Sequence, residues 1–133
     1  MKCFVCNADT PAEVCNSCIR SEKKILEETW IHKEGFLGKI KEDCKITLSN
    51  YRLSGIGLIC RDEDSFSNGR YDTFTHYVGN IDSAKICTIA NKPALMLKII
   101  NPQINVARFI YFPSIADPNQ MLNKISIAIG KKL

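Results

Sequence analysis

Apolar and polar residues alternate along most of the chain beyond residue 24, and turn formers divide the alternation into short blocks. The segment 44–49 has two alternating sets, one apolar and one polar: Cys44, Ile46 and Leu48 against Lys45, Thr47 and Ser49. Successive side chains point to opposite faces of a strand, so this spacing predicts a half-buried strand with a wet face. Further strands are predicted over the segments 53–60, 74–78, 81–89, 94–100 and 104–112.

Turn formers separate these predicted strands. Asn50 begins a turn after the first strand, and the polar stretch Arg61–Thr73 is predicted to be the longest loop. Inside the strand 53–60, Gly55 and Gly57 indicate a bulge or a tight bend, because glycine inside a strand pattern often marks such a site.

The end of the chain carries a complete set of helix signals. Asp117 is a natural N-cap, Pro118 suits the first turn, and Gln120 completes a capping box. Gly130 fits the position after the last turn. Between them lies one apolar stripe at helical spacing: Met121, Leu122, Ile125, Ala128 and Ile129. The sequence therefore predicts a helix over Asp117–Ile129.

The segment 21–35 fits two secondary structures. Apolar positions such as Ile25, Leu26 and Trp30 fit a helix that ends at Gly35. The same residues fit a first strand through positions 29–32, with the segment 35–40 as its continuation. Periodicity alone does not decide between them.

Four cysteines lie within the first 18 residues as two Cys-x-x-Cys pairs with eight residues between them: Cys3, Cys6, Cys15 and Cys18. Zinc takes four such ligands at the corners of a tetrahedron, about 2.3 Å from the metal. The first 24 residues have few large apolar side chains, and metal binding explains how so small a piece folds. We expect one structural zinc ion in a segment spanning residues 1–24, followed by a domain spanning residues 25–133.

The four cysteines also allow three alternatives to zinc. Iron in a rubredoxin-like site is chemically possible with four thiolates. Two disulfides would need an oxidising compartment, and a redox Cys-x-x-Cys would need a strand-to-helix context. The remaining three cysteines (Cys44, Cys60 and Cys87) stand among apolar residues and are predicted to be inert core residues.

Composition indicates a globular chain, with 133 residues, 45% of them hydrophobic and 24% charged. No apolar run reaches the length of a membrane span, and the start lacks a signal-peptide pattern, so we expect a soluble, cytoplasmic protein. The formal net charge is +4, and four thiolates with one Zn²⁺ (−4 and +2) would lower it to +2. This charge does not favour a nucleic-acid partner, and Phe4 is the one aromatic residue of the metal segment available for stacking.

Motifs for catalysis are weak in this sequence. The Gly55-x-Gly57 pair lies inside a strand pattern with no helix after it, unlike a phosphate-binding loop. His32 and His76 have no recognisable nucleophile beside them, and the acidic run 62–64 fits a solvated loop tip. The sequence predicts that the chain is not an enzyme.

The segment 46–53, Ile-Thr-Leu-Ser-Asn-Tyr-Arg-Leu, resembles the L-T-N-x-R-L hairpin of the pleckstrin-homology-like (PH-like) superfamily, in its bacterial and GRAM-type branches. The segment 77–83 resembles the I-x-S stretch of that family, and the resemblance covers residues 25–131. It implies a mainly β (α+β) fold: a partly open barrel of about seven antiparallel strands, capped by a C-terminal α-helix. It also implies a first strand near Leu26–Lys33. The ambiguous segment 21–35 is therefore expected to be a strand from about Glu28 onward. The Cys-rich start resembles a small zinc ribbon.

The resemblance implies a binding module rather than a reaction. Some relatives bind anionic lipid head groups through basic residues near the first two strands, and others bind proteins or form oligomers. The matching basic residues here are Lys33, Lys39, Lys41, Lys45 and Arg52. They fit either a head-group site or an ordinary solvated strand face, because Glu34, Glu42 and Asp43 interleave with them, and Arg52 also fits a role in pinning the hairpin turn.

These observations predict a non-enzymatic intracellular interaction or adaptor module with a structural zinc site, whose partner is a protein. The first alternative is a peripheral membrane module that binds anionic lipid head groups. The second is a zinc-ribbon nucleic-acid binder. Open strand edges also allow the chain to form a homo-oligomer.

Overall fold

The structure is a computed structural model, and it describes residues 1–63, 66 and 69–133. Its strands are β1 (Lys24–Glu34), β2 (Ile40–Ser49), β3 (Arg52–Cys60), β4 (Arg70–Tyr77), β5 (Ile81–Ile89), β6 (Lys92–Asn101) and β7 (Val106–Pro113). Its helices are α1 (Asn16–Ile19) and α2 (Pro118–Ile129), with short 3-10 turns η1 (Phe36–Gly38) and η3 (Val78–Asn80).

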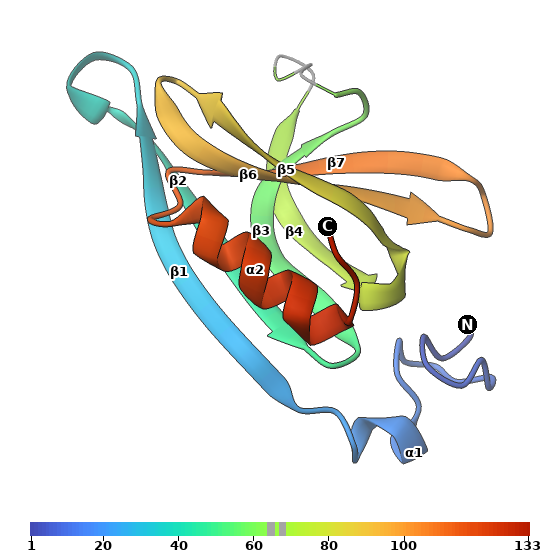
Figure 1. Cartoon of the computed structure of the whole chain (residues 1–133). Coiled ribbons are helices and arrows are strands. Elements are labelled where there is room, and N and C mark those ends of the chain that lie inside the picture. Colours follow the sequence, from blue (N-terminus) through green and yellow to red (C-terminus); the bar gives the residue numbers. More distant parts are fainter. Residues whose placement is uncertain (64–65, 67–68) are drawn as a thin grey trace.

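All seven strands pair antiparallel in one strongly curled sheet, in the order β1-β2-β3-β7-β6-β5, with β4 on the other edge of β3. Helix α2 lies across the open side of the curl (Figure 1). The chain therefore forms the partly open, helix-capped β-barrel predicted for it. The strands β1, β4 and β5 each have one paired neighbour among the described strands.

Strand β3 changes partner halfway along one edge. Its first half pairs with β2 up to Ile56, and its end pairs with β7 from Leu58 onward. Gly57 stands at the change, where an added Cβ would lie 3.0 Å from a side-chain carbon of Ile110. Gly55 has φ +149°, and an added Cβ would lie 1.9 Å from the carbonyl oxygen of Lys45. The two glycines thus allow close backbone approach at a corner of the barrel; the pairing of β2 with β3 runs through Gly55 without a bulge.

The core fills the space between the curled sheet and α2. Its fully buried side chains include Leu53, Ile110 and Phe112 from the strands and Ile125 from the helix. A second cluster at the far end of the barrel contains Cys60, with Cys87 packed against it, while Cys44 is buried in β2. Cys44 and Cys60 are buried core residues, as predicted, whereas Cys87 is half-buried at the edge of the second cluster.

The C-terminal helix follows its sequence signals. The Asp117 carboxylate accepts a hydrogen bond from the Gln120 N–H at 3.0 Å, and Gly130 ends the helix at φ +66°. Met121 and Ile125 are buried, and the rest of the predicted stripe packs against the core.

Some boundaries differ from the predicted ones. The ambiguous segment is a strand from Lys24 onward, preceded by the single turn α1. Strand β4 begins at Arg70, so the predicted loop Arg61–Thr73 is shorter, and its residues Asp64, Ser65, Ser67 and Asn68 lie outside the described residues. The reason is backbone pairing of 70–73 with β3, which polar side chains on a wet face do not reveal.

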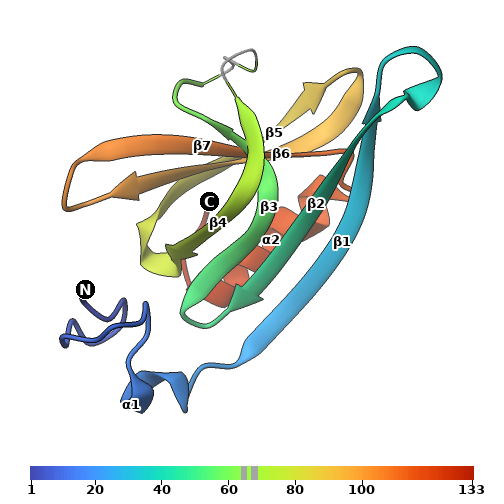
Figure 2. The ribbon, with the colours of Figure 1, turned by 180° about the vertical axis from the view of Figure 1, so that it is seen from behind.

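The β1–β2 hairpin extends beyond the barrel as a two-stranded arm. Positions 40–44 of β2 pair with β1, whereas pairing of β2 with β3 covers Lys45–Leu48. The arm projects away from the barrel in both views (Figures 1 and 2).

Side chains tie the base of this arm to the end of β7. The Trp30 indole N–H donates to the Pro113 carbonyl at 2.7 Å. His32 is fully buried, with Nδ1 2.6 Å from the Ser114 hydroxyl and Nε2 2.7 Å from the Glu34 carboxylate. Side-chain hydrogen bonds therefore link β1 to the end of β7, two strands that do not pair with each other in the sheet.

Candidate metal centre and the contacts around it

The four N-terminal cysteines converge on one point. Their sulfur atoms all lie within 4.8 Å of one another, and the Sγ atoms of Cys6 and Cys15 are 3.6 Å apart. Four ligands on a tetrahedral zinc at about 2.3 Å would lie roughly 3.8 Å from each other. The cluster (Cys3, Cys6, Cys15 and Cys18) therefore has the size and donor chemistry for one thiophilic ion.

Backbone hydrogen bonds shape the two turns that carry these sulfurs. In the first turn, the Asn7 N–H donates to the Cys3 carbonyl at 3.1 Å, and Asn7 adopts the left-handed φ of 63°. In the second, the Ile19 N–H donates to the Cys15 carbonyl at 2.9 Å as α1 forms. The N–H groups of Val5 and Cys15 also point at the Cys3 sulfur, at 3.4 and 3.3 Å.

The electrostatics of the cluster favour a cation. Backbone N–H donors, that of Cys6 foremost, lower the pKa of Cys3 to about 6. The hydrogen bond with the Cys15 thiol, together with burial, raises the pKa of Cys18 to about 12. Four sulfurs this close cannot all ionise without a positive charge among them, and a bound metal ion provides that charge.

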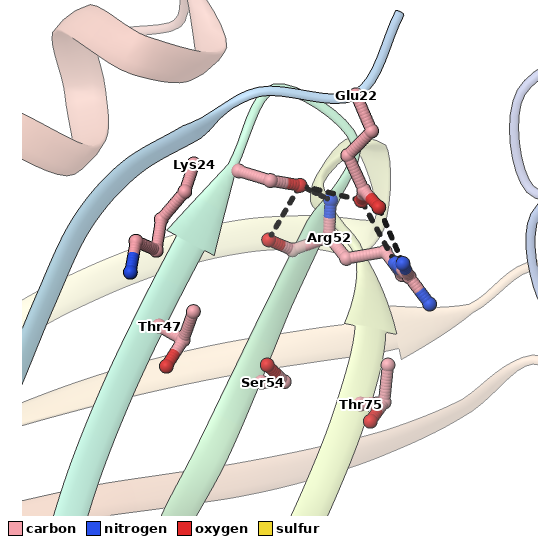
Figure 3. A pocket seen from close by; sticks show the side chains of 7 residues that line it. Glu22, Lys24, Thr47, Arg52, Ser54 and Thr75 are labelled. Carbon is pink, nitrogen blue, oxygen red and sulfur yellow. Dashed lines mark hydrogen bonds and ion pairs between the residues drawn. The ribbon is translucent and has the colours of Figure 1, made fainter. Parts of the chain in front are cut away.

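The Cys-bearing segment is fastened to the β2–β3 end of the barrel by Arg52. Its guanidinium holds the Glu22 carboxylate at two points, with Nε 2.8 Å from one oxygen (Figure 3). The guanidinium also lies 3.3 Å from the Glu13 carboxylate. Phe4 adds an aromatic contact with Tyr77 at the end of β4, with ring centroids 6.2 Å apart. The barrel thus contacts the metal segment through both charge and packing.

Ser49 joins the same network. Its hydroxyl donates to the Glu22 carboxylate at 2.7 Å and accepts from the N–H groups of Tyr51 and Arg52 at 3.1 and 2.8 Å. The alternating pattern predicts Ser49 on the solvent-facing side of its strand. In the structure Ser49 is buried, because the groups that it hydrogen-bonds to surround it. The hydrogen bond from Arg52 lowers the pKa of Glu22 below its usual value. Sequence reasoning missed Glu22, which lies in a joint that shows only a run of charges.

A polar pocket opens beside this network on the outer face of β2, β3 and β4. Three hydroxyl residues in one row, Thr47, Ser54 and Thr75, line its floor, and Lys24 stands at its side (Figure 3). Arg52 and Glu22 neutralise each other at its end. The pocket is therefore hydrogen-bonding in character rather than strongly charged.

The five predicted basic residues do not form one site. Lys33, Lys39 and Lys41 lie on the projecting arm and are exposed. Lys45 lies nearer the barrel, 4.0 Å from Glu27, and Arg52 is engaged at the opposite end of the hairpin. The structure therefore brings together the three lysines of the arm and leaves the other two in ion pairs.

The structure also shows the surroundings of the two histidines, which the sequence did not predict. The His32 ring is fully buried. Both of its nitrogens are in hydrogen bonds, one with Glu34 and one with Ser114, which is far away in the sequence. His76 lies on β4 and stacks on Phe74, and burial lowers its pKa. Both act as structural residues of the sheet.

Comparisons with known proteins add little to this geometry. No family model matches the chain, and no curated protein matches it. Among solved structures, the chain is similar to the Vps36 N-terminal PH domain, with 13% sequence identity, a TM-score of 0.46, and coverage of 84% of this chain and 81% of that one. A likeness of this degree carries no information about ligands. Separately, none of the described helices is both long and apolar enough to cross a membrane.

Proposed function

We propose that the chain is a non-catalytic cytoplasmic binding module, in which a zinc knuckle (residues 1–24) is docked on a PH-like barrel (residues 25–133). One observation carries this proposal. Four cysteine sulfurs gather within 4.8 Å of one another on a segment that Arg52 and Tyr77 hold against the barrel. The knuckle extends the barrel at its β2–β3 end and adds surface for a partner protein.

The donor set supports zinc in a structural role. Four thiolates suit a soft or borderline cation, and zinc with four cysteine ligands is a common structural centre. All four positions of a tetrahedral ion would be filled by the chain, which leaves no place for a water or a substrate. A reducing cytoplasm keeps the thiols available for metal. The chemistry that zinc supplies here is cross-linking of two turns that lack a core of their own.

The contacts of the knuckle favour a protein partner over a nucleic acid. Phe4, its one candidate for base stacking, packs on Tyr77 instead. Lys2 is paired with Asp9 at 2.7 Å, and Glu13 and Glu22 add negative charge beside Arg52. A phosphate backbone requires a cluster of free cations, whereas residues 1–24 hold four basic and three acidic residues, and two of the four basic ones (Lys2 and Lys24) are in ion pairs.

Metal analysis of the purified chain tests the proposal. The full chain, prepared under reducing conditions without added metal, is expected to carry one equivalent of zinc by plasma mass spectrometry. The double variant Cys6→Ser/Cys18→Ser is expected to lose it. The matched control Cys87→Ser, a half-buried barrel cysteine, should keep it. The proposal would be contradicted by a wild-type chain without bound metal. It would also be contradicted by equal zinc contents in the double variant and the Cys87→Ser control.

A further inference from the structure

The four cysteines of the metal centre differ in their exposure to solvent. Cys3 is buried, with 3% of its surface exposed, and Cys15 and Cys18 are half-buried. Cys6 is exposed. Access to the sulfur is one of the properties that decide which thiolate an oxidant attacks. The cluster therefore has one open side, and Cys6 lies on it.

Backbone hydrogen bonds also distinguish the sulfurs. The Cys3 sulfur accepts hydrogen bonds from the N–H groups of Val5 and Cys15, at 3.4 and 3.3 Å. Among the described residues, the hydrogen-bond contact of the Cys6 sulfur is with the Cys15 sulfur, 3.6 Å away, and not with a backbone N–H. Bonding of Cys3 to another sulfur would disturb its two N–H contacts, whereas Cys6 has no such contacts to lose.

Cys6 and Cys15 belong to different turns, and the backbone holds these turns together. The Phe4 N–H donates to the Glu13 carbonyl at 2.8 Å, and each of the two cysteines lies two residues further along the chain. A disulfide has its sulfurs about 2.05 Å apart, so the two sulfurs would need to approach by about 1.5 Å. The residues on either side of Cys6 are exposed, which leaves its side chain room for this movement.

We propose that this pair is a redox switch: hydrogen peroxide oxidises Cys6 and Cys15 to one disulfide, which removes the metal site but keeps the two turns cross-linked. The Cys6 thiolate attacks one peroxide oxygen, so that an S–O bond forms, the O–O bond breaks and hydroxide leaves. The Cys15 thiolate then attacks the Cys6 sulfur, so that the S–S bond forms, the S–O bond breaks and a second hydroxide leaves. Two protons from the solvent convert both hydroxides to water, and the two electrons lost by the thiolates reduce one peroxide.

Oxidation of this pair would release the metal without releasing the knuckle. The disulfide takes two of the four ligands, and Cys3 with Cys18 does not complete a tetrahedral site. The new bond joins positions 6 and 15, while the hydrogen bonds between Arg52 and Glu22 still hold the joint on the barrel. Disulfides in a reducing cytosol are usually transient and often redox-sensing. This inference rests on the proposed zinc knuckle and makes its metal content depend on oxidants.

Disulfide mapping of the full, zinc-loaded chain tests the inference. The chain is treated with one equivalent of hydrogen peroxide, and free thiols are then blocked with N-ethylmaleimide. Trypsin leaves all four cysteines in one peptide, because no lysine or arginine lies between Cys3 and Arg20. A further cut after Glu13, the one glutamate of that peptide, separates the first Cys-x-x-Cys pair from the second.

The expected result is a disulfide that joins the two fragments until it is reduced, with the maleimide label on Cys3 and Cys18. One equivalent of zinc should appear in solution with each disulfide, measured by the colour of pyridylazoresorcinol, and dithiothreitol with zinc should restore the centre. A disulfide within either Cys-x-x-Cys pair would leave the fragments separate and would overturn the inference. Loss of zinc without any disulfide would do the same, as would an unreacted centre in a solution where free N-acetylcysteine is oxidised.

A matched pair of variants checks the assignment. Cys18→Ser and Cys6→Ser each leave three cysteines in the cluster, and each is treated with zinc present. Cys18→Ser keeps the reacting pair and should form the link between the turns, whereas in Cys6→Ser its yield should fall at least about ten-fold, because the accessible thiolate is gone. Equal yields would overturn the assignment.

The zinc content before oxidation reports on the proposed function separately. A chain that carries no zinc contradicts that function. A zinc-loaded chain that forms a different disulfide contradicts the switch alone.

Discussion

Two guanidinium nitrogens of Arg52 donate hydrogen bonds to the carboxylate of Glu22, a residue thirty positions earlier in the chain. The pair is mostly shielded from solvent, with side-chain exposures of 28% and 13%, and Ser49 adds a further hydrogen bond to the same carboxylate. Glu22 lies in the joint between the knuckle and β1, and Arg52 begins β3. Arg52 therefore joins the metal segment to the barrel, together with Ser49 and the contact between Phe4 and Tyr77.

Replacing Arg52 should destabilise the fold. The substitution Arg52→Ala leaves Glu22 partly buried without its cation, and we expect a loss of about 1–3 kcal/mol in the free energy of unfolding by urea. The control is Arg70→Ala, which breaks the pair with Asp72 on an arginine that is 83% exposed. The free energy of unfolding of Arg70→Ala should be close to that of the wild type. Equal effects of the two substitutions would contradict the assigned role of Arg52.

Stability should depend on the charge of His76. Burial lowers the pKa of His76 below its ordinary value of 6.5, so the unfolded chain binds its proton more readily than the folded one. Stability is then full above pH 6.5 and falls as the pH drops through that value. Urea titrations between pH 8 and about pH 5.5 should show this decline in the wild type and a flatter profile in His76→Gln. A steeper profile in the variant would contradict the assignment.

Two glycine substitutions should differ widely in cost. Gly55→Ala would place a Cβ 1.9 Å from the Lys45 carbonyl oxygen at φ +149°, so the β2–β3 pair must move apart. We expect a loss of at least about 3 kcal/mol, from overpacking and backbone strain together. In Gly130→Ala the added Cβ has open space around it, so only backbone strain remains. We expect a loss of about 1 kcal/mol in the free energy of unfolding. Thermal unfolding of the two variants makes the comparison, and similar costs would contradict the close approach at Gly55.

Removal of the metal should loosen the knuckle and spare the barrel. Residues 1–20 have few buried apolar side chains, whereas the barrel has a core that includes Ile46, Leu53 and Phe112. After chelation, hydrogen exchange by mass spectrometry should show fast exchange in 1–20 and retained protection in β3 and β7. Unchanged protection in 1–20 would mean that this segment folds without metal.

The sequence predicts most of the barrel because alternation and turn formers are local signals. It identifies the helix from Asp117 and Gly130, and the sulfur cluster from the spacing of its cysteines. The polar start of β4 at Arg70 was missed, because pairing with β3 rather than side-chain pattern makes that segment a strand.

The contacts that fasten the knuckle to the barrel are not local, which explains why they were missed. Ser49 follows the polar side of its strand pattern, and its burial depends on Glu22, which is distant in sequence. Phe36 and Leu37 fit the continuation of a strand in the sequence; their exposure on a projecting turn is a property of the folded arm.

Cobalt substitution tests the central claim, that Cys3, Cys6, Cys15 and Cys18 hold one metal ion, most directly. Titration of the reduced, metal-free chain with Co²⁺ is expected to produce the intense visible absorption of a tetrahedral tetrathiolate centre. The signal should saturate at one equivalent and be displaced by Zn²⁺. Weak octahedral absorption, no saturation, or the same spectrum from Cys6→Ser/Cys18→Ser would contradict the claim.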